Sequence, residues 1–159
     1  MSQKPFLSGP GPDNSRAIPG ALFHFLCKGE QTGNQFSLLY IEVHKGNEPP
    51  AHTHSNEDES YYILEGEIKF WVGEQVFMAK AGDFIYLPKS IPHKFEVQSE
   101  KVRELMWITP TGLEKWFWDN SAPSPNMQPL PLMKEPPPPE MMNHFVKSLS
   151  EYGVEMVKS

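Results

Sequence analysis

The chain has 159 residues, a net charge of −6 and a single cysteine, Cys27. This length suits one domain with its own core and is too short for two domains of ordinary size. Acidic and basic residues are mixed along the chain, which argues against nucleic acid or an anionic membrane as its main partner. One cysteine excludes an internal disulfide framework, and neither a spanning apolar run nor a signal-peptide pattern is present, so we expect a cytoplasmic protein.

Proline and glycine crowd the first twenty residues, which predicts a flexible N-terminal arm over residues 1–20. Beyond it, short runs of β-branched and aromatic residues alternate with Gly, Pro and charged turns. The strands predicted from these runs cover residues 21–28, 35–44, 61–64, 68–72, 75–79, 84–87, 94–97 and 102–108. Many short strands without a helical period indicate an all-β sandwich or barrel, which we place at residues 21–120.

The last part of the chain, residues 121–159, differs in composition. Its first half is dense in proline and favours extended polyproline geometry, interrupted by Met127, Leu130, Leu132 and Met133. Those apolar side chains predict a strap that packs on the barrel rather than a free linker. Residues 142–149 then show helical spacing of apolar side chains, with Gly153 as a stop, which predicts one short amphipathic helix.

An aromatic group, Trp116, Phe117 and Trp118, precedes this tail. The surrounding residues predict a helical turn packed on the barrel. The three rings would either cover apolar edges, as aromatic side chains in cores usually do, or border the mouth of a pocket.

Four residues of metal-ligand type stand in two segments bounded by glycine. His52, His54 and Glu59 lie between Gly46 and Gly66, and His93 follows Gly82. Side chains two apart on a strand share a face, so His52 and His54 would aim both imidazoles at one point. Three imidazoles and one carboxylate suit one divalent transition metal per chain, whether Fe, Ni, Mn, Cu, Co or Zn, because geometry and supply decide among these ions.

The same segments resemble the two motifs of the cupins, Gly-x5-His-x-His-x4-Glu-x6-Gly and Gly-x5-Pro-x-Gly-x2-His-x3-Asn. The first motif matches at every fixed position. In the second, Ser90 replaces the central Gly and Val97 replaces the final Asn. The resemblance covers roughly residues 35–120 and implies a double-stranded β-helix, the cupin jelly-roll barrel, with the metal inside. Some cupins have a shorter spacing between the second histidine and the carboxylate, so Asp58 is an alternative to Glu59 as the ligand. We prefer Glu59 because six residues separate it from Gly66, as in the motif.

The stretch that begins at Pro110, Pro-Thr-Gly-Leu-Glu-Lys-Trp-Phe, is similar to one in small quercetin-dioxygenase-like cupins. This resemblance implies a metal-dependent dioxygenase that acts on a flavonol-like, enolic or phenolic small molecule, with O2 as a candidate co-substrate. Glu59 would serve as metal ligand and as the catalytic base. Strand alternation turns Tyr61, Ile63 and Phe95 inward, where they would form the substrate pocket.

Two other functions fit the same residues, because one scaffold hosts many reactions. The metal could act only as a Lewis acid in an isomerase or cyclase, or the protein could be a non-enzymatic small-molecule-binding cupin. Small cupins commonly pair through their sheets or N-terminal arms, so the resemblance also implies a homodimer.

Overall fold

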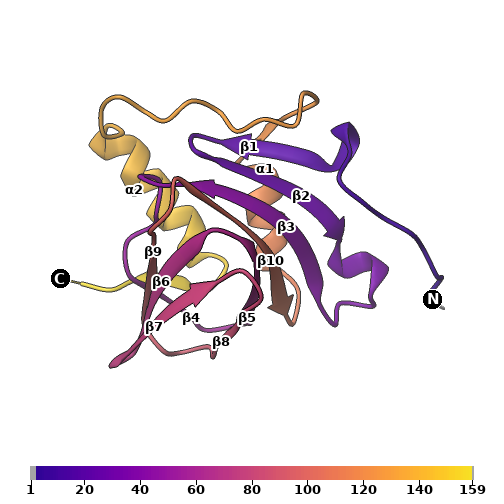
Figure 1. Ribbon diagram of the computed structural model, residues 1–159, viewed down its shortest axis with the longest axis horizontal. Helices are drawn as coiled ribbons and strands as arrows, with labels where there is room; N and C mark the ends of the chain where they lie inside the picture. Colours follow the sequence, from indigo (N-terminus) through magenta and orange to yellow (C-terminus); the bar gives the residue numbers. More distant parts are fainter. Residues whose placement is uncertain (1–2, 159) are drawn as a thin grey trace.

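Strands dominate the computed structural model, which describes residues 3–158 (Figure 1). Those that build the barrel are β3 (Ser37–His44), β4 (His52–His54), β5 (Asp58–Glu65), β6 (Glu67–Val72), β7 (Gln75–Lys80), β8 (Phe84–Leu87), β9 (His93–Val97) and β10 (Lys101–Thr109). Around them lie β1 (Ser15–Ile18), β2 (Ala21–Cys27), β11 (Ala122–Pro123), β12 (Val154–Met156), α1 (Leu113–Asp119), α2 (Pro139–Ser150) and the short 3-10 turns Pro12–Asn14 and Gly29–Gln31.

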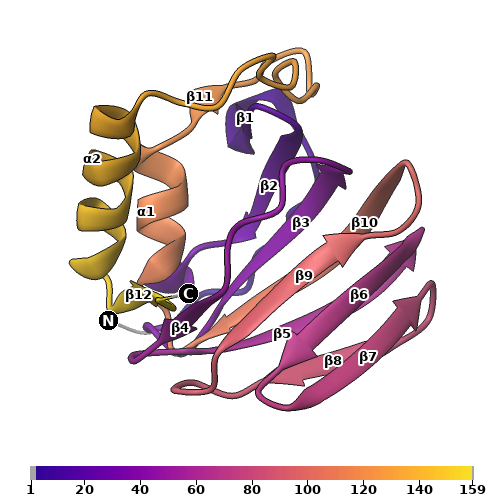
Figure 2. The same cartoon turned by 90° about the vertical axis from the view of Figure 1, so that its left-hand side faces the viewer.

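The strands form two antiparallel sheets. The larger has the order β11-β1-β2-β3-β10-β5-β8, and the smaller has the order β12-β4-β9-β6-β7. From β3 to β10 the chain passes repeatedly from one sheet to the other, so neighbours in sequence face each other across the interior (Figure 2). This crossing pattern is that of a jelly roll, and the predicted all-β barrel with a short C-terminal helix is confirmed.

Alternation along the strands builds the core. In β10, every second residue from Val102 to Ile108 is buried, whereas the residues between them are half-buried. Ile63 from β5 and the two β6 residues Ile68 and Phe70 are completely buried on the facing walls. Burying one such side chain contributes about 1.5–3 kcal/mol, so this shared interior is the main source of stability.

α1 lies against the β1–β3 half of the larger sheet, and α2 packs on the side of α1 that faces away from these strands (Figure 2). The ring of Phe117 packs at 5.2 Å from Phe23, and the ring of Trp118 packs edge-on at 5.0 Å from Phe25. Trp116 is buried and meets Phe145 of α2 at 4.9 Å. The aromatic group therefore covers an apolar sheet surface, the first of the two alternatives considered for it. Within the part of the chain that the structure describes, neither helix has the length and apolarity needed to cross a bilayer.

The N-terminal arm is more ordered than its composition predicts. Residues 15–18 form β1, which pairs with β2 on one side and β11 on the other. Burial alternates along Ser15–Ile18, and Gly20 adopts a positive φ of 72° in the turn, so these residues can form a hairpin. The prolines around them had indicated a loop instead.

The proline-rich strap runs past the β1–β2 turn, where the amide of Gly20 donates to the carbonyl of Leu130 at 2.8 Å. Its apolar side chains are less buried than expected for anchors. Met127, Leu130, Leu132 and Met133 remain 40–48% exposed. Backbone pairing therefore holds this segment at least as much as apolar contact does.

Candidate metal centre

The structure brings the four ligand-type residues together inside the barrel. His52 and His54 point inward from β4, His93 begins β9 directly opposite His52, and Glu59 projects from β5 in the facing sheet. All four side chains are buried. One nitrogen or carboxylate oxygen from each lies within 4.8 Å of the corresponding atom of every other. Sequence spacing alone had suggested this convergence.

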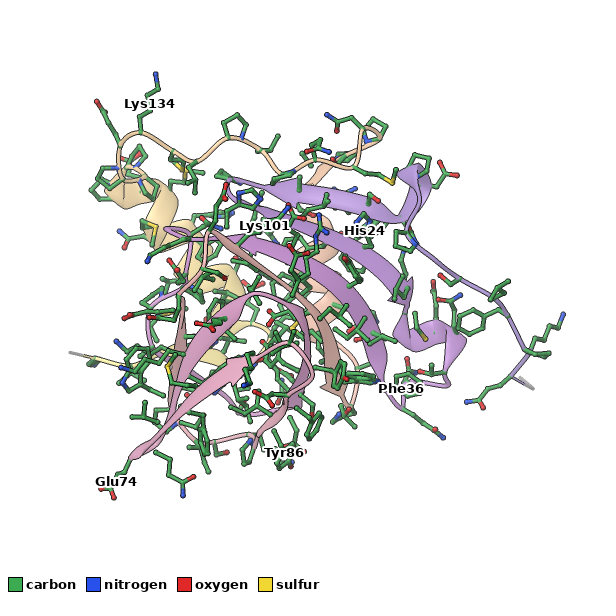
Figure 3. All side chains as sticks on the ribbon, in the orientation of Figure 1. His24, Phe36, Glu74, Tyr86, Lys101 and Lys134 are labelled. Carbon is green, nitrogen blue, oxygen red and sulfur yellow. The ribbon has the colours of Figure 1, made fainter. Side chains whose placement is uncertain are left out.

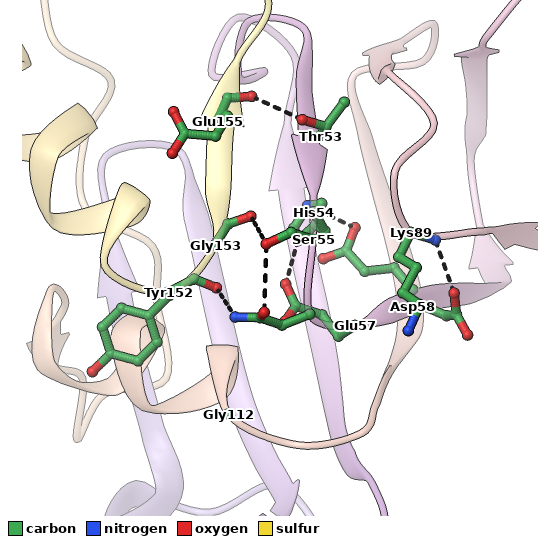
Figure 4. Close-up of polar contacts among 12 residues, drawn as sticks. Thr53, His54, Ser55, Glu57, Asp58, Lys89, Gly112, Tyr152, Gly153 and Glu155 are labelled. Atoms are coloured by element: carbon green, nitrogen blue, oxygen red, sulfur yellow. Dashed lines mark hydrogen bonds and ion pairs between the residues drawn. The ribbon is translucent and has the colours of Figure 1, made fainter.

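Asp58 lies outside the cluster. Successive residues of a strand point to opposite faces, so the side chain of Asp58 leaves the interior when that of Glu59 enters it. Its Oδ1 instead accepts a hydrogen bond from the amide of Lys89 at 2.8 Å (Figure 4). Of the two carboxylates considered, only Glu59 has the geometry of a ligand.

Hydrogen bonds fix the orientation of all three imidazoles. Nδ1 of His52 donates to the carbonyl of Pro50 at 2.8 Å, and Nδ1 of His93 donates to the carbonyl of Ile91 at 3.2 Å. A carbonyl can only accept, so Nδ1 carries the proton in these rings and Nε2 presents a lone pair. Nδ1 of His54 is paired at 2.5 Å with the carboxylate of Glu57.

Two of the inward nitrogens have no hydrogen-bond partner among residues 3–158, although they lie 3.6 and 3.5 Å from Oε2 of Glu59. Nε2 of His54 and Nε2 of His93 are both buried and unsatisfied. Buried polar atoms nearly always find a partner, and a metal ion would satisfy both nitrogens at once. The residues present therefore fit a bound divalent transition metal.

The electrostatics of the cluster favour a cation. Burial alone would raise the pKa of Glu59, but the surrounding histidines outweigh it and lower that pKa to about 2. Burial lowers the pKa of His52 to about 4, so this ring is neutral at pH 7. Burial also acts to lower the pKa of His54, yet Glu59 and Glu57 prevail and raise it. A charged carboxylate beside three imidazoles, which bind a metal through their unprotonated nitrogens, is a suitable donor set.

Glu57 is the residue that sequence analysis missed. It lies in the polar stretch between His54 and Glu59, and its side chain is buried. In the sequence, only its position three residues after the candidate ligand His54 indicated a role beside that histidine. Outer carboxylates of this kind orient an imidazole and make it a stronger donor.

The C-terminal strand β12 also supports the ligand-bearing strand. It pairs with β4 so that Val154 lies opposite His54 and Met156 lies opposite His52. The contacts continue past the strand, where the Oγ of Ser55 donates to the carbonyl of Gly153 at 3.1 Å (Figure 4). A segment nearly one hundred residues away in sequence therefore holds two of the candidate ligands in place.

A loop on the other side of β4 holds it as well. Ser90, which replaces the glycine of the second motif, adopts a positive φ of 66°. Its amide donates to the carbonyl of His54 at 2.7 Å. The serine thus takes the backbone conformation that glycine adopts most readily.

The residues expected to line a substrate pocket lie on the inner wall of the barrel. Tyr61 and Ile63 share the face of β5 that carries Glu59, and the Tyr61 hydroxyl donates to Oε2 of Glu59 at 3.1 Å. Phe95 is half-buried and packs at 6.0 Å from Phe70.

The structure is thus an antiparallel jelly roll that encloses a candidate metal site of three histidines and one glutamate. A protein-family model described as a cupin domain matches residues 39–109. This match and the relatives described below support a small cupin-superfamily protein.

Among curated proteins, quercetin 2,3-dioxygenase from Bacillus subtilis is 26% identical over 106 residues, which cover 66% of this chain and 32% of that enzyme. Quercetin 2,3-dioxygenase from Aspergillus japonicus is 23% identical over 104 residues, covering 61% and 30%. The chain thus spans about a third of the length of these two relatives.

Solved structures share the fold. A predicted oxalate decarboxylase from Thermotoga maritima is 23% identical, with a TM-score of 0.56 over 61% of this chain and 92% of that one. An ectoine synthase from P. lautus is 19% identical, with a TM-score of 0.57 over 69% and 78%. Identity at this level establishes the architecture alone.

Replacing Glu57 with glutamine should weaken metal binding without unfolding the barrel. The variant removes the charge that pairs with Nδ1 of His54, and loss of such an outer partner typically costs about 10–100-fold in metal affinity. Competition with a fluorescent chelator measures this affinity. Glu155→Gln on exposed β12 is the matched control, and equal affinities of the two variants would contradict a role for Glu57.

Proposed function

We propose that this protein is a metal-dependent dioxygenase that acts on a flavonol-like, enolic or phenolic small molecule inside the barrel. The observation that carries the proposal is the buried cluster of three histidines and Glu59, with two imidazole nitrogens left unsatisfied. The similarity to two proteins named quercetin 2,3-dioxygenase supports the choice of substrate class.

His52, His54, His93 and Glu59 would hold the metal. Four protein donors leave at least one position open on a five- or six-coordinate ion, which is typical of a catalytic site. The ion, when bound, supplies Lewis acidity that favours the deprotonated form of a phenolic or enolic hydroxyl.

Glu59 is the base in this proposal. Its low pKa keeps the carboxylate ionised, and the Tyr61 hydroxyl holds Oε2 at 3.1 Å. Oε1 is then available to take the proton of a hydroxyl that enters the cluster, because a general base must lie within hydrogen-bond reach of the proton. Tyr61, Ile63 and Phe95 would give the substrate an apolar and phenolic surface to pack against.

Quercetin with an oxygen electrode tests the activity. The metal-loaded protein should consume substrate and O2 in equal amounts, and Glu59→Gln should lower the rate by at least ~100-fold because both base and ligand are changed. Asp58→Asn, whose carboxylate faces away from the cluster, should retain the rate. Turnover without O2 uptake would refute the oxygenase and favour a Lewis-acid isomerase or cyclase, and binding without turnover would favour a small-molecule binder.

A homodimer through the outer face of β5 and β8 is also proposed. Phe84 and Tyr86 are 61% and 51% exposed there, beside Tyr62 and Leu64, and Figure 3 shows Tyr86 projecting from the lower edge of the barrel. Apolar and aromatic side chains dominate this face, although Asp58 also projects from it beside Tyr86, and the same face of a second copy complements it in an isologous contact. Light scattering should give twice the chain mass, and Phe84→Glu should halve it; a monomeric wild type would contradict the proposal.

A further inference from the structure

Glu104 is a buried ionisable side chain that the proposed chemistry does not use. It lies on β10 between Ile41 of β3 and Ile63 of β5. Strand alternation turns it inward with Met106, and its exposed fraction is 1%. Its Oε2 is fully buried and has no hydrogen-bond partner.

An unpaired carboxylate is very costly in such a place, so the group keeps its proton. Burial, and to a smaller extent the negative charge of Glu59, raises the pKa of Glu104 to about 8. At neutral pH the side chain is therefore mostly a carboxylic acid, with an O–H that needs an acceptor. The Tyr61 hydroxyl on the adjacent strand donates to Glu59, and among residues 3–158 no hydrogen bond joins it to Oε2 of Glu104.

Strand register places Glu104 along the same wall as the metal cluster. Ile108 lies beside Glu59, Met106 beside Tyr61 and Glu104 beside Ile63. Four residues along a strand correspond to roughly 13 Å between the Cα atoms of Glu59 and Ile63. A molecule that contacts the cluster and runs along Tyr61 would bring its far end toward Glu104.

We propose that Glu104 donates its carboxyl O–H to a carbonyl or ether oxygen of the small molecule bound in the barrel. It thereby fixes which end of that molecule faces the metal cluster. This assignment rests on the proposed function, and it gives the substrate class a further feature: an oxygen acceptor remote from the hydroxyl that Glu59 deprotonates. Pockets of this kind commonly use a few such polar groups within apolar walls to orient a ligand.

Anaerobic calorimetry with quercetin as the probe tests the role of Glu104. The metal-loaded wild type is compared with Glu104→Met, which removes the donor, and Glu104→Gln, which keeps one. We expect Glu104→Met to bind quercetin about tenfold more weakly and to melt at a higher temperature, because an apolar side chain no longer buries an unpaired polar atom. Glu104→Gln should bind within about threefold of the wild type, since an amide N–H replaces the O–H. Met106→Leu, on the same inward face, measures the effect of repacking alone.

The outcomes separate this proposal from the proposed function. If the wild type binds and oxidises quercetin while Glu104→Met binds it equally well, the role of Glu104 is overturned and the dioxygenase stands. Equal losses of affinity in the Met and Gln variants with lowered melting temperatures would show a structural carboxyl and would also overturn it. If the wild type does not bind quercetin, both proposals fail.

Discussion

Glu59→Gln is expected to abolish stable metal binding while leaving the barrel folded. The amide lacks the charge that the cluster provides for a cation and is a far weaker ligand than a carboxylate, so affinity should fall by at least ~100-fold. Removing this charge also removes the attraction of the surrounding histidines, which outweighs its desolvation, so some folding stability should be lost while the barrel still forms. Equilibrium dialysis against Mn(II) or Ni(II), with circular dichroism for the fold, measures both effects.

Asp58→Asn is the matched control for this variant. It changes the neighbouring carboxylate by the same chemistry, but that side chain bonds to the amide of Lys89 outside the cluster. Its metal affinity should equal that of the wild type. A reversed result, in which Asp58→Asn loses the metal and Glu59→Gln keeps it, would show that the chain uses the shorter motif spacing.

Among alanine substitutions of the motif glycines, Gly66→Ala should lower the free energy of unfolding the most. A Cβ at this position would lie 2.3 Å from the carbonyl oxygen of Lys101 and 2.6 Å from Oγ of Ser99, and φ is +87°. The positive φ alone costs roughly 1–3 kcal/mol, and shifting backbone at the close contact adds a similar amount. Urea denaturation should therefore give a free energy of unfolding about 2–6 kcal/mol lower than that of the wild type.

Gly82→Ala separates the two causes. Gly82 has a φ of +95°, but no atom lies within 4 Å of a Cβ built there. This variant should lose only the conformational part, about 1–3 kcal/mol. Equal losses in the two variants would mean that the contact with Lys101 relaxes freely, contrary to the packing described here.

Much of this arrangement could be predicted from the chain itself. In β6 and β10, buried residues alternate with more exposed ones, so local pattern and tertiary structure agree there. The spacing of His52, His54 and Glu59 reflects the two-residue period of strands, and His93 was found by its distance from Gly82. In each case the signal lies within a short stretch of sequence.

Features that depend on distant pairing were missed. β12 is only three residues long and becomes a strand because β4 offers an unpaired edge. Glu57 reads as part of a polar turn until packing buries it against His54. Glu104 stands among the charged residues at the start of β10, and only its phase with Val102 and Met106 places it on the inward face. Long-range contacts, rather than local propensity, decide these positions.

Metal content of the purified wild-type protein, determined by plasma mass spectrometry, shows whether the buried cluster is a metal centre. We expect close to one transition-metal ion per chain, lost when His52 or Glu59 is replaced. Iron, nickel, copper or manganese would agree with the proposed oxygenase, whereas zinc would favour Lewis-acid chemistry or binding. A protein that holds no transition metal, even after reconstitution with each of these ions, would contradict the assignment of the cluster as a metal centre.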